Sequence, residues 1–283
     1  MFVGGVHRSG TTAIARLLAA HPQVSGFSGT GQTEDEGQHL QDIYPPAREY
    51  GGAGRFALRP EAHLTESSPL ATPANAERLF EQWSRHWDLR RPVLVEKSPP
   101  NVVMTRFLQA LFPAARHVIV VRHPVVVALS TSRWAHTTPL RRLVEHWLRA
   151  YETFLADATH LRAVHVIRYE HLVAEPERAL GQVANFLGLQ GPVPTGTLER
   201  HRSDTYERRW AELSDSNWPW QRRSVRRIRA ELGARIAGFG YDVADLARIG
   251  PFPSVPSPAA PPALAPAPAV GSRAPGDARS EPS

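Results

Sequence analysis

The chain has 283 residues, 42% hydrophobic and 21% charged, with a net charge of +6, which suits one or two globular domains with a hydrophobic core. It contains no cysteine, so disulfide frameworks, thiolate nucleophiles and Cys-ligated zinc or iron–sulfur sites are excluded. No apolar window approaches about 18 residues and no basic leader precedes the first apolar run, so we expect a soluble, cytoplasmic protein without a membrane span.

Short apolar runs alternate with amphipathic segments along the first 250 residues. Continuous apolar runs are typical of strands covered on both faces, and they predict strands at Phe2–Val6, Pro92–Val95, His117–Val121 and Ala163–Ile167. Apolar residues at three- and four-residue spacing predict helices at Thr11–Ala20, Val102–Leu111, Val125–Ser132, Leu140–Ala158, Pro176–Leu187 and about Gln221–Ala237. This alternation predicts a three-layer α/β fold with a central parallel sheet and a functional site at the carboxyl ends of its strands.

Three segments lack such periodicity. Residues Gly26–Gly54 and His201–Pro219 are expected to form loops over the site. Residues Pro251–Ser283 are a Pro/Ala/Ser mixture with ten prolines and few large apolar side chains, which predicts a disordered tail. We therefore expect one catalytic domain over residues 1–250 and a tail over residues 251–283.

The first strand runs directly into Gly5-Val-His-Arg-Ser-Gly10-Thr-Thr12 and then into a helix. Backbone N–H groups of a glycine loop and of a helix N-terminus converge there, which predicts an anion site and a P-loop-like fold. The spacing of the two glycines is that of the phosphate-binding loop of nucleotide hydrolases, but Thr11 stands where those proteins have Lys, and Arg8 lies inside the loop. The alternative is an ordinary glycine turn.

A second anion site is predicted after the strand His117–Val121. Arg122 follows this strand and Ser130 lies eight residues further on, so a guanidinium and a hydroxyl can reach one phosphate. The alternative is an Arg that caps a strand and a Ser that bonds its own helix backbone.

One residue is unusual by type. Of the 33 basic residues only Lys97 is a lysine, which indicates that Arg would not serve at that position.

Taken in order, these motifs carry a resemblance to a known family. The sequence resembles the sulfotransferases that use 3′-phosphoadenosine 5′-phosphosulfate (PAPS), and among them the bacterial, tyrosylprotein-sulfotransferase-like branch most closely. The segments that carry this resemblance are His7–Thr12, Glu96–Pro99, Val121–Pro124 with Ser130, and Arg168–Val173. The similarity extends to about Asp242. It implies transfer of a sulfuryl group from PAPS to a hydroxyl or amine, release of 3′-phosphoadenosine 5′-phosphate (PAP), and no metal.

The resemblance also implies the residues that bind the donor. Those implied at the 5′-phosphosulfate are Arg8, Ser9, Gly10, Thr11 and Thr12, and those at the 3′-phosphate are Arg122 and Ser130. Tyr169 matches a position near the adenine, although an aromatic at a strand end is more often core. Arg208 or Arg209 could cover the nucleotide, although a charge run is more often a solvated face.

The catalytic groups are expected around the same loop. Lys97 matches the lysine that contacts the transferring group in relatives. The resemblance also implies Arg8 as a further catalytic residue. Pro99 stands where the cytosolic branch has a histidine base, so the base must come from elsewhere. Relatives with a Glu in the loop after the first helix make Glu36 the first choice, with Glu34 and His39 as alternatives.

Two other functions stay open at this point. A nucleotide or small-molecule kinase would require a Lys after Gly10 and an acidic magnesium ligand, whereas a non-catalytic nucleotide-binding protein would need neither Lys97 nor a base. The acceptor could be a small molecule, a glycan or a peptide. No nucleic-acid partner is expected, because no recognisable module surrounds the basic segment.

Overall fold

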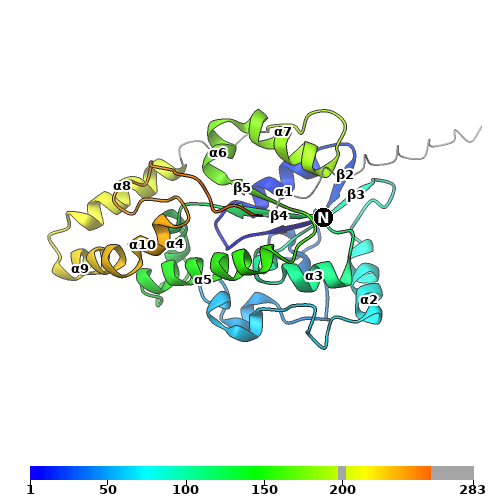
Figure 1. Cartoon of the computed structure of the whole chain (residues 1–283), viewed down its shortest axis with the longest axis horizontal. Coiled ribbons are helices and arrows are strands. Elements are labelled where there is room, and N and C mark those ends of the chain that lie inside the picture. The colour runs from blue at the N-terminus through cyan, green and yellow to red at the C-terminus, as the bar shows by residue number, and fades with distance from the viewer. Residues whose placement is uncertain (197–201, 256–283) are drawn as a thin grey trace, which may run out of the picture.

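A computed structural model describes residues 1–196 and 202–255 (Figure 1). Its centre is a five-stranded sheet in the order β2-β3-β1-β4-β5, and every pair of neighbours is parallel. The strands are β1 (Phe2–Gly4), β2 (Val24–Gly26), β3 (Val93–Lys97), β4 (His117–Val121) and β5 (Val164–Arg168). The predicted parallel sheet is confirmed.

Helices cover both faces of this sheet, so the expected three layers are also confirmed. Strand β4 shows the division, because Val118 and Val120 belong to one hydrophobic cluster while Ile119 and Val121 belong to the other. The first face carries α1 (Thr11–Ala19), α6 (Tyr169–Ala174) and α7 (Pro176–Leu187). The second carries α2 (Pro73–Ser84), α3 (Thr105–Leu111), α4 (Pro124–Ser132) and α5 (Leu140–Ala158).

A helical unit follows and projects from the end of the sheet marked by α4 in Figure 1. It consists of α8 (Arg202–Ser214), α9 (Pro219–Arg227), a π-helical turn (Ile228–Leu232) and α10 (Gly233–Ala237). The expected loop at 201–219 is therefore wrong for residues 202–214, which form α8, while residues 215–218 connect α8 to α9. Helix α8 is polar and buries few apolar side chains, among them Tyr206 and Trp210, so its sequence carries little periodic signal.

The remaining elements are short. The region expected as a loop at Gly26–Gly54 holds 3₁₀ turns at Thr33–Asp35, Gly37–His39 and Ala47–Tyr50. Further 3₁₀ turns lie at Phe56–Leu58, Pro60–Ala62 and Pro99–Val103.

The C-terminal segment stays packed slightly beyond the expected domain boundary. Phe252 lies 5.8 Å from the ring of Phe239, and Val255 packs against the main hydrophobic cluster. The rest of the expected tail, residues 256–283, lies outside the described residues.

Candidate functional site

The loop between β1 and α1 has a backbone that only glycine can provide at two positions. Gly5 has φ 154° and Gly10 has φ 107°. A Cβ on Gly5 would lie 2.6 Å from the Val120 carbonyl oxygen, and a Cβ on Gly10 would collide with the ring of Tyr169. Helix α1 begins at Thr11 without a side-chain cap, so no capping side chain occupies its first N–H groups. The loop can therefore receive an anion at the helix N-terminus.

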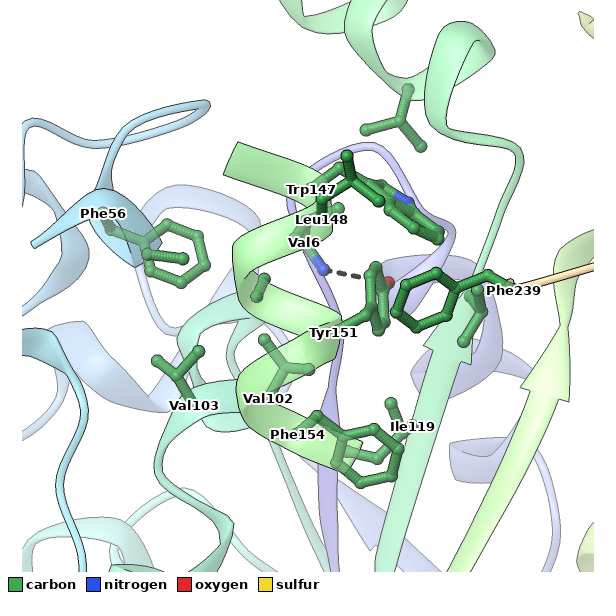
Figure 2. Packing of buried hydrophobic residues seen from close by; sticks show 14 of the residues in the cluster. Val6, Phe56, Val102, Val103, Ile119, Trp147, Leu148, Tyr151, Phe154 and Phe239 are labelled. Atoms are coloured by element: carbon green, nitrogen blue, oxygen red, sulfur yellow. Dashed lines mark hydrogen bonds between the residues drawn. The ribbon is translucent and has the colours of Figure 1, made fainter. Parts of the chain in front are cut away.

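Helix α5 supports this loop and the end of β4 together. The Tyr151 hydroxyl donates to the Val120 carbonyl at 2.6 Å. It also accepts the Val6 N–H at 3.3 Å (Figure 2). One turn earlier, the Trp147 indole donates to the Arg122 carbonyl at 3.0 Å. Both predicted anion-binding segments thus rest on one buried helix.

Arg8 connects the two segments directly. Its backbone has φ 72°, its Nε donates to Ser130 Oγ at 2.9 Å, and its guanidinium lies 4.6 Å from the ring centre of Trp134. Arg8 comes from the first loop and Ser130 from α4, so the predicted 5′ and 3′ phosphate sites are neighbours. Of the other predicted loop residues, Ser9 and Thr11 are buried and Thr12 is half-buried.

Arg122 is buried at the end of β4. Its guanidinium lies 4.3 Å from the ring centre of Tyr169, and its Nη1 donates to the Arg8 carbonyl at 3.4 Å. Burial lowers the pKa of Arg122 below its usual value, and the nearby Tyr169 acts in the opposite direction. An arginine nevertheless keeps its charge in a protein, so this site presents a cation with little competing water.

Tyr169 and Arg208 are placed differently from their expected roles. Tyr169 is buried between Arg122 and Gly10, so little of its ring is open to a nucleobase. Arg208 is exposed on α8, where it lines a cavity of about 670 Å³ together with Arg133.

The side chain of α8 that reaches the second anion site is Tyr206, which the sequence reasoning missed. Its hydroxyl donates to Ser130 Oγ at 3.1 Å. Interactions with Ser130 and with the cations Arg133 and Arg8 lower the pKa of Tyr206, although burial, the largest single cause, raises it. Nothing in the sequence marks this tyrosine, because α8 itself was not predicted.

Lys97 and Glu36 form a buried ion pair beside the first loop. The Lys97 ammonium lies 3.3 Å from Glu36 Oε1, and the two side chains are 5% and 7% exposed. Lys97 also donates to Thr12 Oγ1 at 3.3 Å and to the Glu34 carbonyl at 2.7 Å. The predicted lysine, the predicted acid and the anion loop are therefore in mutual contact.

The alternative bases lie further from this lysine. The Glu34 carboxylate pairs with Arg16 at 3.5 Å and is about half exposed, so only its carbonyl faces Lys97. His39 Nε2 lies 3.9 Å from Glu36 Oε2, and burial is the largest cause that lowers the pKa of His39. Of the three candidates, Glu36 is the one whose carboxylate meets the ammonium.

The described part of the chain holds neither a candidate metal cluster nor a membrane-spanning helix. Residues 1–196 and 202–255 contain no group of three or more His, Asp or Glu side chains that could hold a metal ion. Within the same ranges, no helix is both long and apolar enough to cross a membrane.

Comparison with known proteins gives consistent matches. The chain is 25% identical over 198 residues to protein-tyrosine sulfotransferase 2 of Gallus gallus, covering 67% of this chain and 51% of the relative. It is 28% identical over 200 residues to protein-tyrosine sulfotransferase 1 of Danio rerio, covering 67% of this chain and 53% of that relative. It thus spans about half the length of these curated relatives.

Among solved structures, the sulfotransferase domain from the Synechococcus PCC 7002 olefin synthase aligns with a TM-score of 0.46 and 21% identity. The alignment covers 70% of this chain and 77% of that one. The profile of the sulfotransferase family matches residues 1–192, more than half of the sequence, and the chain therefore belongs to the sulfotransferase family.

Proposed function

We propose that this protein transfers the sulfuryl group of PAPS to a hydroxyl or amine acceptor and releases PAP. The observation that carries the proposal is a pair of adjoining cation-bearing anion sites, the first of which contacts a buried lysine–carboxylate pair. Arg8 reaches Ser130 of the second site, while Lys97 reaches both Thr12 of the first loop and Glu36. A donor that has a phosphosulfate at one end and a second phosphate on its ribose fits such a pair of sites.

The donor would lie across the two sites. The loop residues Arg8, Ser9, Gly10, Thr11 and Thr12 would hold the 5′-phosphosulfate through backbone N–H groups, hydroxyls and one guanidinium. Arg122 and Ser130 would hold the 3′-phosphate, with Tyr206 as a third contact through Ser130. Arg8, Arg122 and Lys97 together supply three cations, which supports binding of this donor without a metal.

The transfer is an in-line displacement at sulfur. The acceptor oxygen or nitrogen forms a bond to sulfur, the bond from sulfur to the bridging oxygen breaks, and the electron pair stays on PAP. Glu36 would take the acceptor proton as the general base. Lys97 would stabilise the negative charge that develops on the bridging oxygen, and its compact ammonium suits this task better than a planar guanidinium.

A screen with ³⁵S-labelled PAPS tests this proposal. Small hydroxyl and amino compounds, glycans and tyrosine peptides are offered in parallel, and label on an acceptor is measured without added metal. Glu36→Gln should lower turnover by roughly 10²–10⁴. The matched change Glu34→Gln should do much less, because that carboxylate pairs with Arg16 instead of Lys97. Equal losses in both variants would contradict Glu36 as the base.

A further inference from the structure

Behind the Lys97–Glu36 pair lies a second acid, Glu96, whose side chain has no exposed surface. Both of its carboxylate oxygens accept hydrogen bonds: Oε1 from the Ser98 hydroxyl at 2.6 Å and Oε2 from the Asn101 amide. Burying a carboxylate is costly, and among the described residues no Lys, Arg or His forms a salt bridge with this one. Burial of this carboxylate therefore needs a structural or functional reason, and neither of the two anion sites uses Glu96.

The Glu96 carboxylate lies directly against the loop that carries the proposed base. A Cβ added to Gly37 would collide with Glu96 Oε1, so only the bare backbone of Gly37 fits there. On its other side, the Gly37 carbonyl accepts the Trp83 indole N–H at 3.0 Å. The loop is thus held between Trp83 and Glu96 at the residue that follows Glu36.

The contact continues through two hydrogen bonds to Glu36 itself. Ser98, whose hydroxyl donates to Glu96, accepts the Gln38 backbone N–H at 2.9 Å. The side-chain amide of Gln38 donates in turn to Glu36 Oε2. A chain of contacts therefore runs from Glu96 to Ser98, to Gln38 and to Glu36, while Lys97 is the next residue after Glu96 on β3.

We propose that Glu96 is a positioning residue which, through Ser98, fixes the Gly37–Gln38 backbone to the end of β3 and so holds Glu36 against Lys97. We call Glu96, Ser98 and Gln38 the Glu96 clamp. The inference builds on the proposed function, because it explains how that base and that lysine keep their geometry. Tight positioning of reacting groups is a large part of catalysis, and a small displacement lowers turnover strongly.

The single lysine of the chain offers a test that does not need activity. Lys97 is the only lysine in the sequence, so acetylation by N-hydroxysuccinimidyl acetate, read by mass spectrometry of its peptide, reports one site. Burial raises the pKa of Glu96 to about 7, so labelling is measured at pH 8, where its carboxylate is ionised. In the wild type, labelling should be slow, since the ammonium is buried and donates to three oxygens.

Glu96→Gln and the milder Ser98→Ala should each raise the labelling rate by about fivefold or more, as expected when a local segment opens more often. Ser98→Thr keeps the hydroxyl and should restore slow labelling. Glu170→Gln is the matched control: it alters a partly buried acid, which accepts the His123 N–H at 2.7 Å beside another strand end, and it should leave Lys97 labelling unchanged. Thermal unfolding checks that every variant is folded. If Glu96→Gln does not fold, Ser98→Ala alone tests the clamp.

Where transfer is measured, Glu96→Gln should lower kcat by roughly tenfold and change the KM for PAPS by less than about twofold, because the hydrogen bonds of the clamp side chains lead to Glu36, Ala47 and Asn101 and to one another, away from the two phosphate sites. Unchanged labelling in both clamp variants would overturn the inference. Faster labelling in clamp variants of a protein that transfers no sulfuryl group would support the clamp and refute the proposed function. A labelling increase in Glu170→Gln equal to that in the clamp variants would also overturn it, since general loosening would then explain the result.

Discussion

Replacement of Lys97 by Met tests the buried ion pair. Methionine keeps a side chain of similar length but leaves the Glu36 carboxylate, 7% exposed, without its cation. Loss of one partner from a buried pair costs about 3–5 kcal/mol of folding free energy. A domain of this size loses about 2–4 °C of Tm per kcal/mol, so we expect Tm to fall by roughly 6–20 °C.

The double variant Lys97→Met/Glu36→Gln separates the pair from simple packing. It removes the unpaired charge, so it should be more stable than Lys97→Met alone by about 1–3 kcal/mol in a double-mutant cycle. Turnover of Lys97→Met should fall by roughly 10²–10³, as when a transition-state donor is removed. PAP affinity should change little, because PAP lacks the transferred group. An unchanged Tm in Lys97→Met, with no coupling in the cycle, would refute the reasoning.

Three further changes test the anion sites and the core. Arg122→Ala should weaken PAP binding by about 1.5–3 kcal/mol and erase most of the preference for PAP over 5′-AMP, measured by calorimetry. Tyr206→Phe should weaken PAP by about 0.5–1.5 kcal/mol and leave 5′-AMP unchanged, and an equal loss for both would contradict its contact with the 3′ site. Burial lowers the pKa of His117 to about 3, so the unfolded chain binds this proton first and stability is lost as pH falls below about 6.5. His117→Leu should therefore raise Tm more at pH 5 than at pH 7, and an equal shift at both pH values would contradict this.

The parts of the fold with strong local signals could be predicted from the sequence. Strand β4 is apolar at every position after His117, and α5 repeats its apolar residues at helical spacing, so both were expected with their observed bounds. Strand β2 has only three residues and α8 is mostly polar, and neither gives a periodic pattern. Strand β1 ends at Gly4, two residues earlier than expected, where the chain turns into the loop, and β3 continues to Lys97.

The candidate site likewise has residues that could be predicted from the sequence and contacts that could not. Glycine spacing and residues at strand ends placed Arg8, Lys97 and Arg122 near one edge of the sheet, because parallel strands end together. Glu36 was the first choice of base through the resemblance, but the residues alone left Glu34 and His39 open, since the position of each side chain depends on how the loop folds. Contacts such as Gly37 against Glu96 and Tyr206 against Ser130 join segments that are distant in sequence, and they leave no local pattern.

Calorimetric titration with PAP, 5′-AMP, 3′-AMP and magnesium ATP tests the central claim most directly, since it asks whether one nucleotide fills both anion sites. PAP should bind without metal and more tightly than either monophosphate by at least about tenfold, because each monophosphate lacks one charge-assisted contact. Magnesium ATP should bind more weakly than PAP, because Thr11 stands where a nucleotide hydrolase has its lysine. If magnesium ATP binds as tightly as PAP, or if PAP binds no better than 5′-AMP, the proposed donor site is contradicted.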